Sequence, residues 1–301
     1  MAFREIGSVL KKTYQDVMNN HTMALAAGLS YYFVMSLFPA LILAAAVVAY
    51  LPIPDLFGKT LGAMQQFVPA DSMGVVKSVL RDVITPSRGG FLTIGILGTI
   101  WAASGGFASL IEALNVSYDV PETRPIWKTR SLAIGLMLVI GGLMVLAAIA
   151  MFLGPAFGTW LAAKLDLSSI FATLWPFLRW AISVAFIVLA VELMFYWAPN
   201  VKQRFGSTLP GAAVGVGFWV VASWALGLYF QHFANFNKTY GALGAAVALM
   251  VWLYWSWFFM LVGAEINSEL LKAQGHGRME LKEPPPRAVY ARPAWDEDKA
   301  A

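Results

Sequence analysis

The sequence predicts an all-α integral membrane protein built as a bundle of six transmembrane helices. Its 301 residues are 59% hydrophobic and 13% charged, whereas soluble domains carry about 25% charged residues. Long stretches also lack Lys, Arg, Asp and Glu altogether, namely 22–54, 89–111, 131–163, 205–237 and 239–264. Because a spanning helix needs about 20 predominantly apolar residues, each stretch is long enough to cross a bilayer.

A sixth candidate span, 167–201, is apolar except for Arg179 and Glu192. We therefore predict a membrane domain over 25–270, with spans near 25–51, 91–114, 131–153, 176–198, 210–233 and 241–268. The pair Gly211 and Gly215 has G-x-x-x-G spacing, which favours close packing of helices in lipid.

The segments outside the spans are predicted from their patterns. Within 1–24, apolar residues recur every three or four positions, which indicates an amphipathic helix that either lies on the inner membrane surface or packs on the bundle. Two helical patterns within 52–90 predict a small helical cap on the outer face. The tail 271–301 contains PPP and mixed charges, which predicts disorder.

Orientation follows from the basic residues. With both termini inside, the inner segments hold 14 Lys and Arg and the outer segments hold 7. The short loop WKTR at 127–130, preceded by Arg124, supports this assignment because short loops follow the positive-inside rule best. We predict that the N-terminus and the C-terminus are both cytoplasmic.

Several separated motifs resemble one known family. They are AAGLSYYFVMSLFPAL (26–41), WAASGGFASLIEALNVSYDVPETR (101–124), APN (198–200), PGA (210–212) and NKTYGALGAAVALMVWLY…GAEIN (237–267). The chain resembles the YihY/BrkB family of bacterial inner-membrane proteins from about residue 10 to 272. The resemblance implies six helices in the inner membrane and an unsettled biochemical function. Some members carry a virulence-factor or serum-resistance label, and others an old ribonuclease BN label that is widely regarded as a misassignment.

Three carboxylates mark the membrane region. Glu112, Glu192 and Glu265 stand toward the C-terminal ends of spans two, four and six, and all three ends point inward in the predicted topology. Charged residues within spans are costly and commonly face a cavity or a partner. One interpretation is an inward-opening polar cavity; the other is a set of interfacial carboxylates that pair with basic loops. For Glu192, six residues inside its span, the two interpretations are balanced.

The candidate site residues form two groups. The predicted polar cavity contains Glu192, Glu112, Tyr31, Tyr32 and Ser36. The predicted inner-interface cluster contains Glu265, Asn267, Asn115, Arg124, Arg130 and Arg204. Pro39 removes a backbone donor and predicts a kink in span one. That kink either opens a broken helix toward a solute or is satisfied by Ser36 and neighbouring helices.

The sequence argues against a nuclease or another enzyme. Cysteine is absent, and the three histidines, His21, His232 and His276, are isolated from other metal-ligating residues. Metal-assisted hydrolysis needs clustered His, Asp or Glu, so we expect no metal, no cofactor and no nucleic-acid partner. The full phosphate-cradling pattern Gly-x-x-x-x-Gly-Lys-Ser/Thr does not occur.

The leading hypothesis is a transport-type protein that moves a small solute or a lipid-like amphiphile, with the lipid bilayer as its surroundings. The alternative is a non-transporting scaffold that supports envelope integrity by binding partner proteins, and a ribonuclease is the least favoured reading. The protein is also a candidate homo-oligomer, because small residues in spans allow close packing between chains as well as within one chain.

Overall fold

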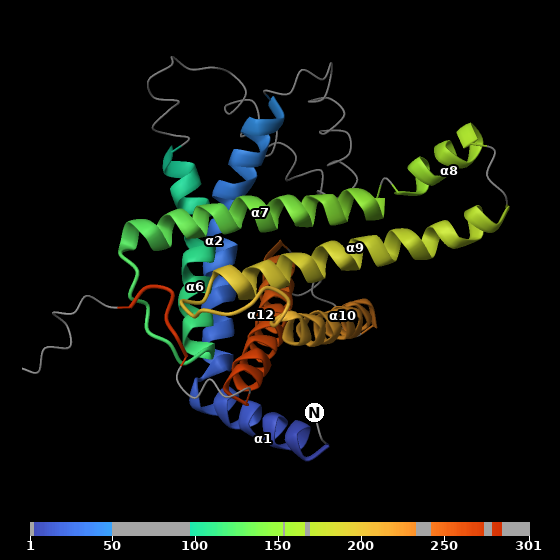
Figure 1. Ribbon diagram of the computed structural model, residues 1–301. Helices are drawn as coiled ribbons and strands as arrows, with labels where there is room; N and C mark the ends of the chain where they lie inside the picture. Colours follow the sequence, from blue (N-terminus) through green and yellow to red (C-terminus); the bar gives the residue numbers. More distant parts are fainter. Residues whose placement is uncertain are drawn as a thin grey trace, which may run out of the picture.

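The computed structural model describes residues 3–49, 97–152, 154–165, 169–232, 242–273 and 279–284. Within these residues every regular element is a helix (Figure 1). The helices are α1 (Phe3–Asn19), α2 (Thr22–Ala49), α6 (Gly105–Ser117), α7 (Ile126–Phe152), α8 (Gly154–Leu165), α9 (Ser169–Trp197), α10 (Leu209–His232) and α12 (Ala242–Ala273). The all-α prediction is confirmed for this part of the chain.

Five helical stretches are long and apolar enough to cross a membrane. They are Leu97–Ser117, Ile126–Met151, Thr173–Trp197, Leu209–Tyr229 and Ala246–Ala273. Each coincides with one of the predicted spans. The first predicted span is α2, in which the apolar stretch that could be tested, Thr22–Leu37, is shorter. The length and hydropathy of these helices fit a multi-pass membrane protein, and the count of six spans stays a prediction.

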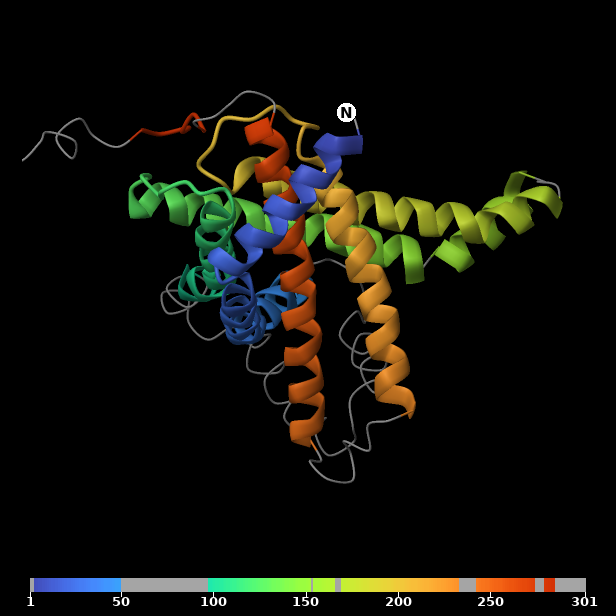
Figure 2. The same ribbon diagram turned by 90° about the horizontal axis from the view of Figure 1, so that it is seen from below.

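The long helices form three main pairs, α10 with α12, α7 with α9 and α2 with α6, and α2 packs on α12 even more extensively than on α6. Figures 1 and 2 show the pairs diverging in different directions rather than running side by side as one bundle. They meet where the N-terminal ends of α2 and α10 approach the C-terminal ends of α6, α9 and α12. We call this region the polar junction. These are the ends that the predicted topology assigns to the inner side.

The α10–α12 pair crosses at close range. A Cβ atom on Gly211 would collide with the carbonyl oxygen of Gly263, and a Cβ atom on Gly263 would lie 2.5 Å from the carbonyl oxygen of Gly211. One turn along, a Cβ atom on Gly215 would lie 3.2 Å from the carbonyl oxygen of Phe259. The predicted close packing at Gly211 and Gly215 is confirmed as a contact within the chain.

The second predicted span is interrupted, and α2 stabilises the interruption. Helix runs over 97–103, turns at Ser104 and resumes as α6. The Oγ of Ser36 accepts a hydrogen bond of 2.9 Å from the backbone N–H of Gly106. α2 itself continues through Pro39 to its end at Ala49, so the proline does not terminate the helix.

The N-terminal segment forms the predicted helix, and α1 packs against α12. Val9, Thr13 and Val17 are buried, whereas Leu10, Tyr14 and Met18 form an exposed stripe. Of the two alternatives for this helix, packing on other helices is therefore observed. The exposed stripe leaves a membrane-surface contact as a prediction.

Two features of the structure differ from the predictions, and one predicted segment lies outside the described residues. The helix α8 was not predicted, and Trp175 of α9 contacts its start by donating a 2.6 Å hydrogen bond to the carbonyl of Gly154. Within the tail predicted to be disordered, 271–273 continue α12, and 279–284 pack on the polar junction. The predicted cap at 52–90 lies outside the described residues.

Candidate functional site

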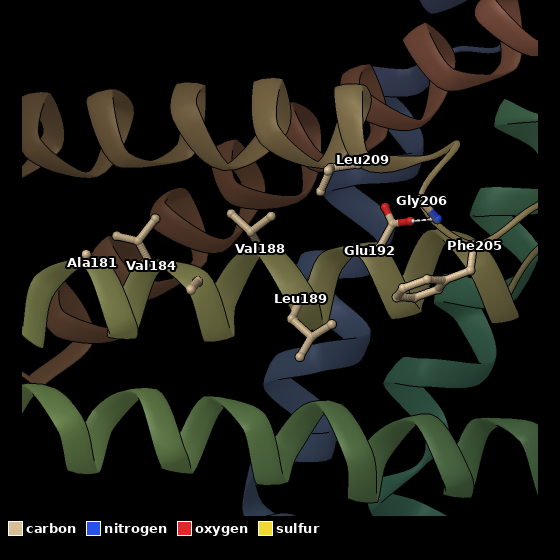
Figure 3. Close-up of a pocket in the computed structure, with 9 residues that line it drawn as sticks. Ala181, Val184, Val188, Leu189, Glu192, Phe205, Gly206 and Leu209 are labelled. Carbon is tan, nitrogen blue, oxygen red and sulfur yellow. Dashed lines mark hydrogen bonds between the residues drawn. The ribbon is translucent and has the colours of Figure 1, made fainter. Parts of the chain in front are cut away.

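An open groove of about 540 Å³ runs along α9 toward the polar junction (Figure 3). Its walls are apolar apart from one carboxylate. We call it the Glu192 groove; its lining residues are Ala181, Val184, Ala185, Val188, Leu189, Glu192, Phe205, Gly206 and Leu209. The α9 members recur every three or four positions, so they share one helix face, and they span about 16 Å at 1.5 Å per residue.

Glu192 closes the end of the groove at the polar junction. The residue is only 2% exposed, and its Oε1 accepts a 2.7 Å hydrogen bond from the backbone N–H of Gly206. That N–H comes from the loop between α9 and α10, where Gly206 has φ +86°, a conformation that glycine adopts readily. Its Oε2 is buried and accepts no hydrogen bond from the described residues. The groove therefore ends on a carboxylate with one unsatisfied oxygen.

Asn267 joins α12 to the start of α10. Its Oδ1 accepts a 2.8 Å hydrogen bond from the N–H of Gly211, and its Nδ2 donates a 2.7 Å bond to the carbonyl of Thr208. The first turn of a helix has N–H groups without intrahelical acceptors, so this side chain caps α10 from a neighbouring helix. The close approach at Gly211 allows the amide to reach both atoms.

Glu265 lies two residues before Asn267 in α12. It is fully buried, and its Oε1 accepts bonds from Asn20 Nδ2 (3.1 Å) and Thr22 Oγ1 (3.4 Å). Oε2 again has no donor among the described residues. Glu265 thus fastens the turn between α1 and α2 to α12.

Lys272, at the end of α12, pairs with three acidic residues from different segments of the chain. Its Nζ lies 2.5 Å from Glu269, 2.8 Å from Asp119 and 3.5 Å from Asp16. Burial raises the pKa of Asp16 although Lys272 opposes the shift. Burial also raises the pKa of the Tyr118 phenol, and the carboxylates of Glu192 and Glu265 add to the effect.

Two asparagines tie the loops of the polar junction together. Asn115 donates a 2.8 Å bond to Glu122 and accepts a 2.8 Å bond from the N–H of Asn200. Asn200 in turn donates to Thr123 Oγ1 at 2.7 Å and accepts from the N–H of Glu283 at 3.1 Å. Both asparagines are buried, so they join the end of α6, the loop after α9 and the tail.

Ion pairs fix the same loops. Arg124 contacts both oxygens of Glu122 and donates a 2.8 Å bond to the carbonyl of Ala198. Lys128 pairs with Glu283 at 2.9 Å. Lys282 donates to three carbonyls at the end of α9, those of Tyr196, Trp197 and Pro199. Burial, with the nearby charge of Arg124, lowers the pKa of Lys282 to about 8.

Some predicted site residues lie elsewhere, and the cavity predicted from Glu192, Glu112 and the tyrosines is not assembled. Glu112 is exposed and shares its face of α6 with exposed Val116, whereas Ile111 and Asn115 point inward. Tyr31 and Tyr32 are about half exposed and contact each other edge to face. Helical geometry explains the difference, because adjacent positions point about 100° apart.

The predicted inner-interface cluster is brought together in part. Glu265, Asn267, Asn115 and Arg124 all lie in the polar junction. Arg130 instead packs over the ring of Trp101, 4.1 Å from its centroid. Arg204 is exposed and forms no ion pair with the described residues.

Sequence reasoning missed several neutral members of the junction, Asn20, Thr22, Tyr118 and Asn200. Tyr118 and Asn200 stand in motifs that carry the family resemblance, and their position at span ends was an available signal. Within the ranges described here, no three His, Asp or Glu residues lie close enough to hold a metal ion.

Comparison with known proteins agrees with this architecture. A sequence model of the family described as virulence factor BrkB matches residues 13–287. The putative ribonuclease-like protein YfkH of Bacillus subtilis (strain 168) is 31% identical over 88% of this chain and 96% of its own. A UPF0761 membrane protein of Stenotrophomonas maltophilia (strain R551-3) is 28% identical over 81% of this chain and 56% of its own.

A third relative is a UPF0761 membrane protein of Xanthomonas campestris pv. campestris (strain B100), 27% identical over 85% of this chain and 59% of its own. The chain thus spans little more than half the length of these two UPF0761 relatives. No solved structure matches. The resemblance drawn from the motifs is confirmed, since the match covers most of the chain: it belongs to the family described as virulence factor BrkB, a family of membrane proteins.

Proposed function

We propose that this chain is a transport-type protein of the bacterial inner membrane that moves a lipid-like amphiphile along the Glu192 groove. The observation that carries the proposal is the groove itself, which combines an apolar wall along α9 with one buried carboxylate at its inner end. An intramembrane ionisable residue beside a cavity is a common mark of a substrate path.

The wall chemistry favours an amphiphile over a hydrophilic solute. Apart from Glu192, every side chain that lines the groove is apolar, and an apolar wall offers a polar solute no replacement for its lost hydrogen bonds to water. An acyl chain loses no hydrogen bonds there. Both termini on the cytoplasmic side would set the carboxylate near the inner leaflet.

Lipid movement in proteoliposomes tests the proposal. Fluorescent phospholipids in the inner leaflet become accessible to an external quencher only if they cross the bilayer. We expect the purified protein to accelerate crossing, and Val184→Trp to slow it because the indole would fill the groove. Leu178→Trp is the matched control, since Leu178 is exposed on α9 and does not line the groove.

Crossing rates equal to those of empty vesicles would overturn the proposal. That outcome would favour the alternative, a non-transporting scaffold for envelope integrity, for which Glu192→Gln should be silent in cells. The name of one relative raises ribonuclease activity. RNA cleavage by the detergent-solubilised protein, abolished by replacing one acidic residue, would support that reading instead.

A further inference from the structure

The Glu192 carboxylate lacks a cationic partner within the described residues. It is almost fully buried, one neutral N–H contacts Oε1, and Oε2 accepts nothing. A buried ionised carboxylate is stable only when it is paired or well hydrogen-bonded. One cationic group that also donates a hydrogen bond would satisfy this carboxylate. The groove leads directly to Glu192 (Figure 3).

Cations of the neighbouring loops are engaged elsewhere, with one exception. Lys202 pairs with Glu280 at 2.6 Å, and Arg124 pairs with Glu122 at the same distance. Arg204, two residues before Gly206, is exposed and forms no ion pair with the described part of the chain. The loop that closes the groove therefore carries a guanidinium with no ion-pair partner among the described residues, two positions before the glycine that donates to Glu192.

We propose that the Glu192 groove binds a phospholipid with a primary-amine headgroup, of which phosphatidylethanolamine is the simplest. Its ammonium donates to Oε2 of Glu192, its phosphate lies toward Arg204, and one acyl chain follows the α9 face from Leu189 to Ala181. This assignment rests on the proposed function and names the headgroup that the same site selects.

Headgroup chemistry separates this ligand from other membrane lipids. A choline headgroup carries the same charge but has no N–H to donate to Oε2. A glycerol headgroup carries no cation, so it leaves the Glu192 carboxylate without a charge partner and adds the phosphate charge near it. Hydrogen bonds between charged groups are about twice as strong as neutral ones, so the loss of this contact should weaken binding about tenfold.

Native mass spectrometry of the intact chain measures the selection. The protein is mixed with phosphatidylethanolamine, phosphatidylcholine and phosphatidylglycerol of identical acyl chains. We expect the ethanolamine lipid to be retained about tenfold over the other two. Glu192→Gln should abolish the preference, and Glu112→Gln, which removes an exposed carboxylate outside the groove, should preserve it.

A series of N-methylated headgroups on the unmodified protein gives a second test that needs no variant. Binding should persist with one or two methyl groups and fall with the third, when the last N–H is lost. Equal retention across the series, or equal loss of preference in both glutamine variants, would overturn the assignment.

The two proposals fail in different ways. If the protein binds all three lipids equally and Val184→Trp still slows lipid crossing, the headgroup assignment is wrong and the proposal of lipid movement stands. Selective binding of the amine lipid without any flux removes the transport function and leaves the binding site intact.

Discussion

Replacing Gly211 with alanine should destabilise the crossing of α10 and α12. The added Cβ would lie 2.5 Å from Cγ and Nδ2 of Asn267 and would collide with the carbonyl of Gly263. Ordinary contact begins at 3.4 Å, so relief of the Asn267 contact alone requires a separation of about 0.9 Å, and the closer carbonyl requires more. That shift would lengthen the 2.8 Å bond from Gly211 N–H to Asn267 beyond hydrogen-bonding distance.

The expected cost combines both effects. Overpacking of this kind costs about 1–3 kcal/mol, and a lost buried hydrogen bond costs about 1 kcal/mol. The free energy of unfolding should therefore fall by about 2–4 kcal/mol. Gly217→Ala is the matched control on the same helix, because a Cβ atom there meets nothing within 4 Å. It should be neutral or stabilise by up to about 1 kcal/mol.

Unfolding in mixed micelles of increasing denaturing-detergent content measures both variants against the parent. The helical signal reports unfolding, and a tryptophan fluorescence trace checks that the transition is shared. Equal midpoints for Gly211→Ala and Gly217→Ala would refute the reasoning, because the close crossing predicts that only one of them suffers.

Three further predictions concern the hydrogen bonds and charges around the junction. Ser36→Ala should lower the free energy of unfolding by about 1–3 kcal/mol, because it leaves a buried N–H unpaired. Ser30→Ala loses only a hydrogen bond within its own helix and should cost less. Equal losses in thermal unfolding would contradict this. Asn200→Ala should release 279–284 and speed tryptic cleavage of the tail about tenfold by mass spectrometry; an unchanged rate would argue against the tail contact. Burial raises the pKa of Glu122, but the hydrogen bonds and charge of Arg124 outweigh burial and lower the pKa below 4.5. The stabilisation that ionised Glu122 gives the folded state is therefore present above pH 4.5 and is lost as the pH falls through the folded-state pKa. Thermal scans of Glu122→Gln should show a shallower fall in acid than the parent, and parallel curves would refute the assignment.

The helical architecture was predictable because hydropathy is a local property. The spans ended close to the observed helices, and the N-terminal helix followed from its apolar spacing. Glu112 and Glu192 show where such reasoning stops. Both are carboxylates near the C-terminal ends of spans, yet one is exposed and the other is buried in a groove. Which face of a helix meets a neighbour depends on packing, which no single span encodes.

The tail illustrates the same limit. Its composition indicated disorder, but Glu283 and Lys282 find partners on Asn200 and on the carbonyls at the end of α9. Those acceptors lie about 80 residues away along the chain, so composition alone gives no sign of them.

The sequence by itself determined that this chain crosses a membrane, because its charged residues are too few and too clustered to coat a soluble surface. Only the tertiary structure decided which polar side chains meet at the junction and which carboxylate faces the groove. The physical reason is the distance along the chain over which each effect acts. The free energy of transfer from water to lipid is a sum over the residues of one helix. A hydrogen bond or a close crossing between helices exists only after two distant segments have packed together.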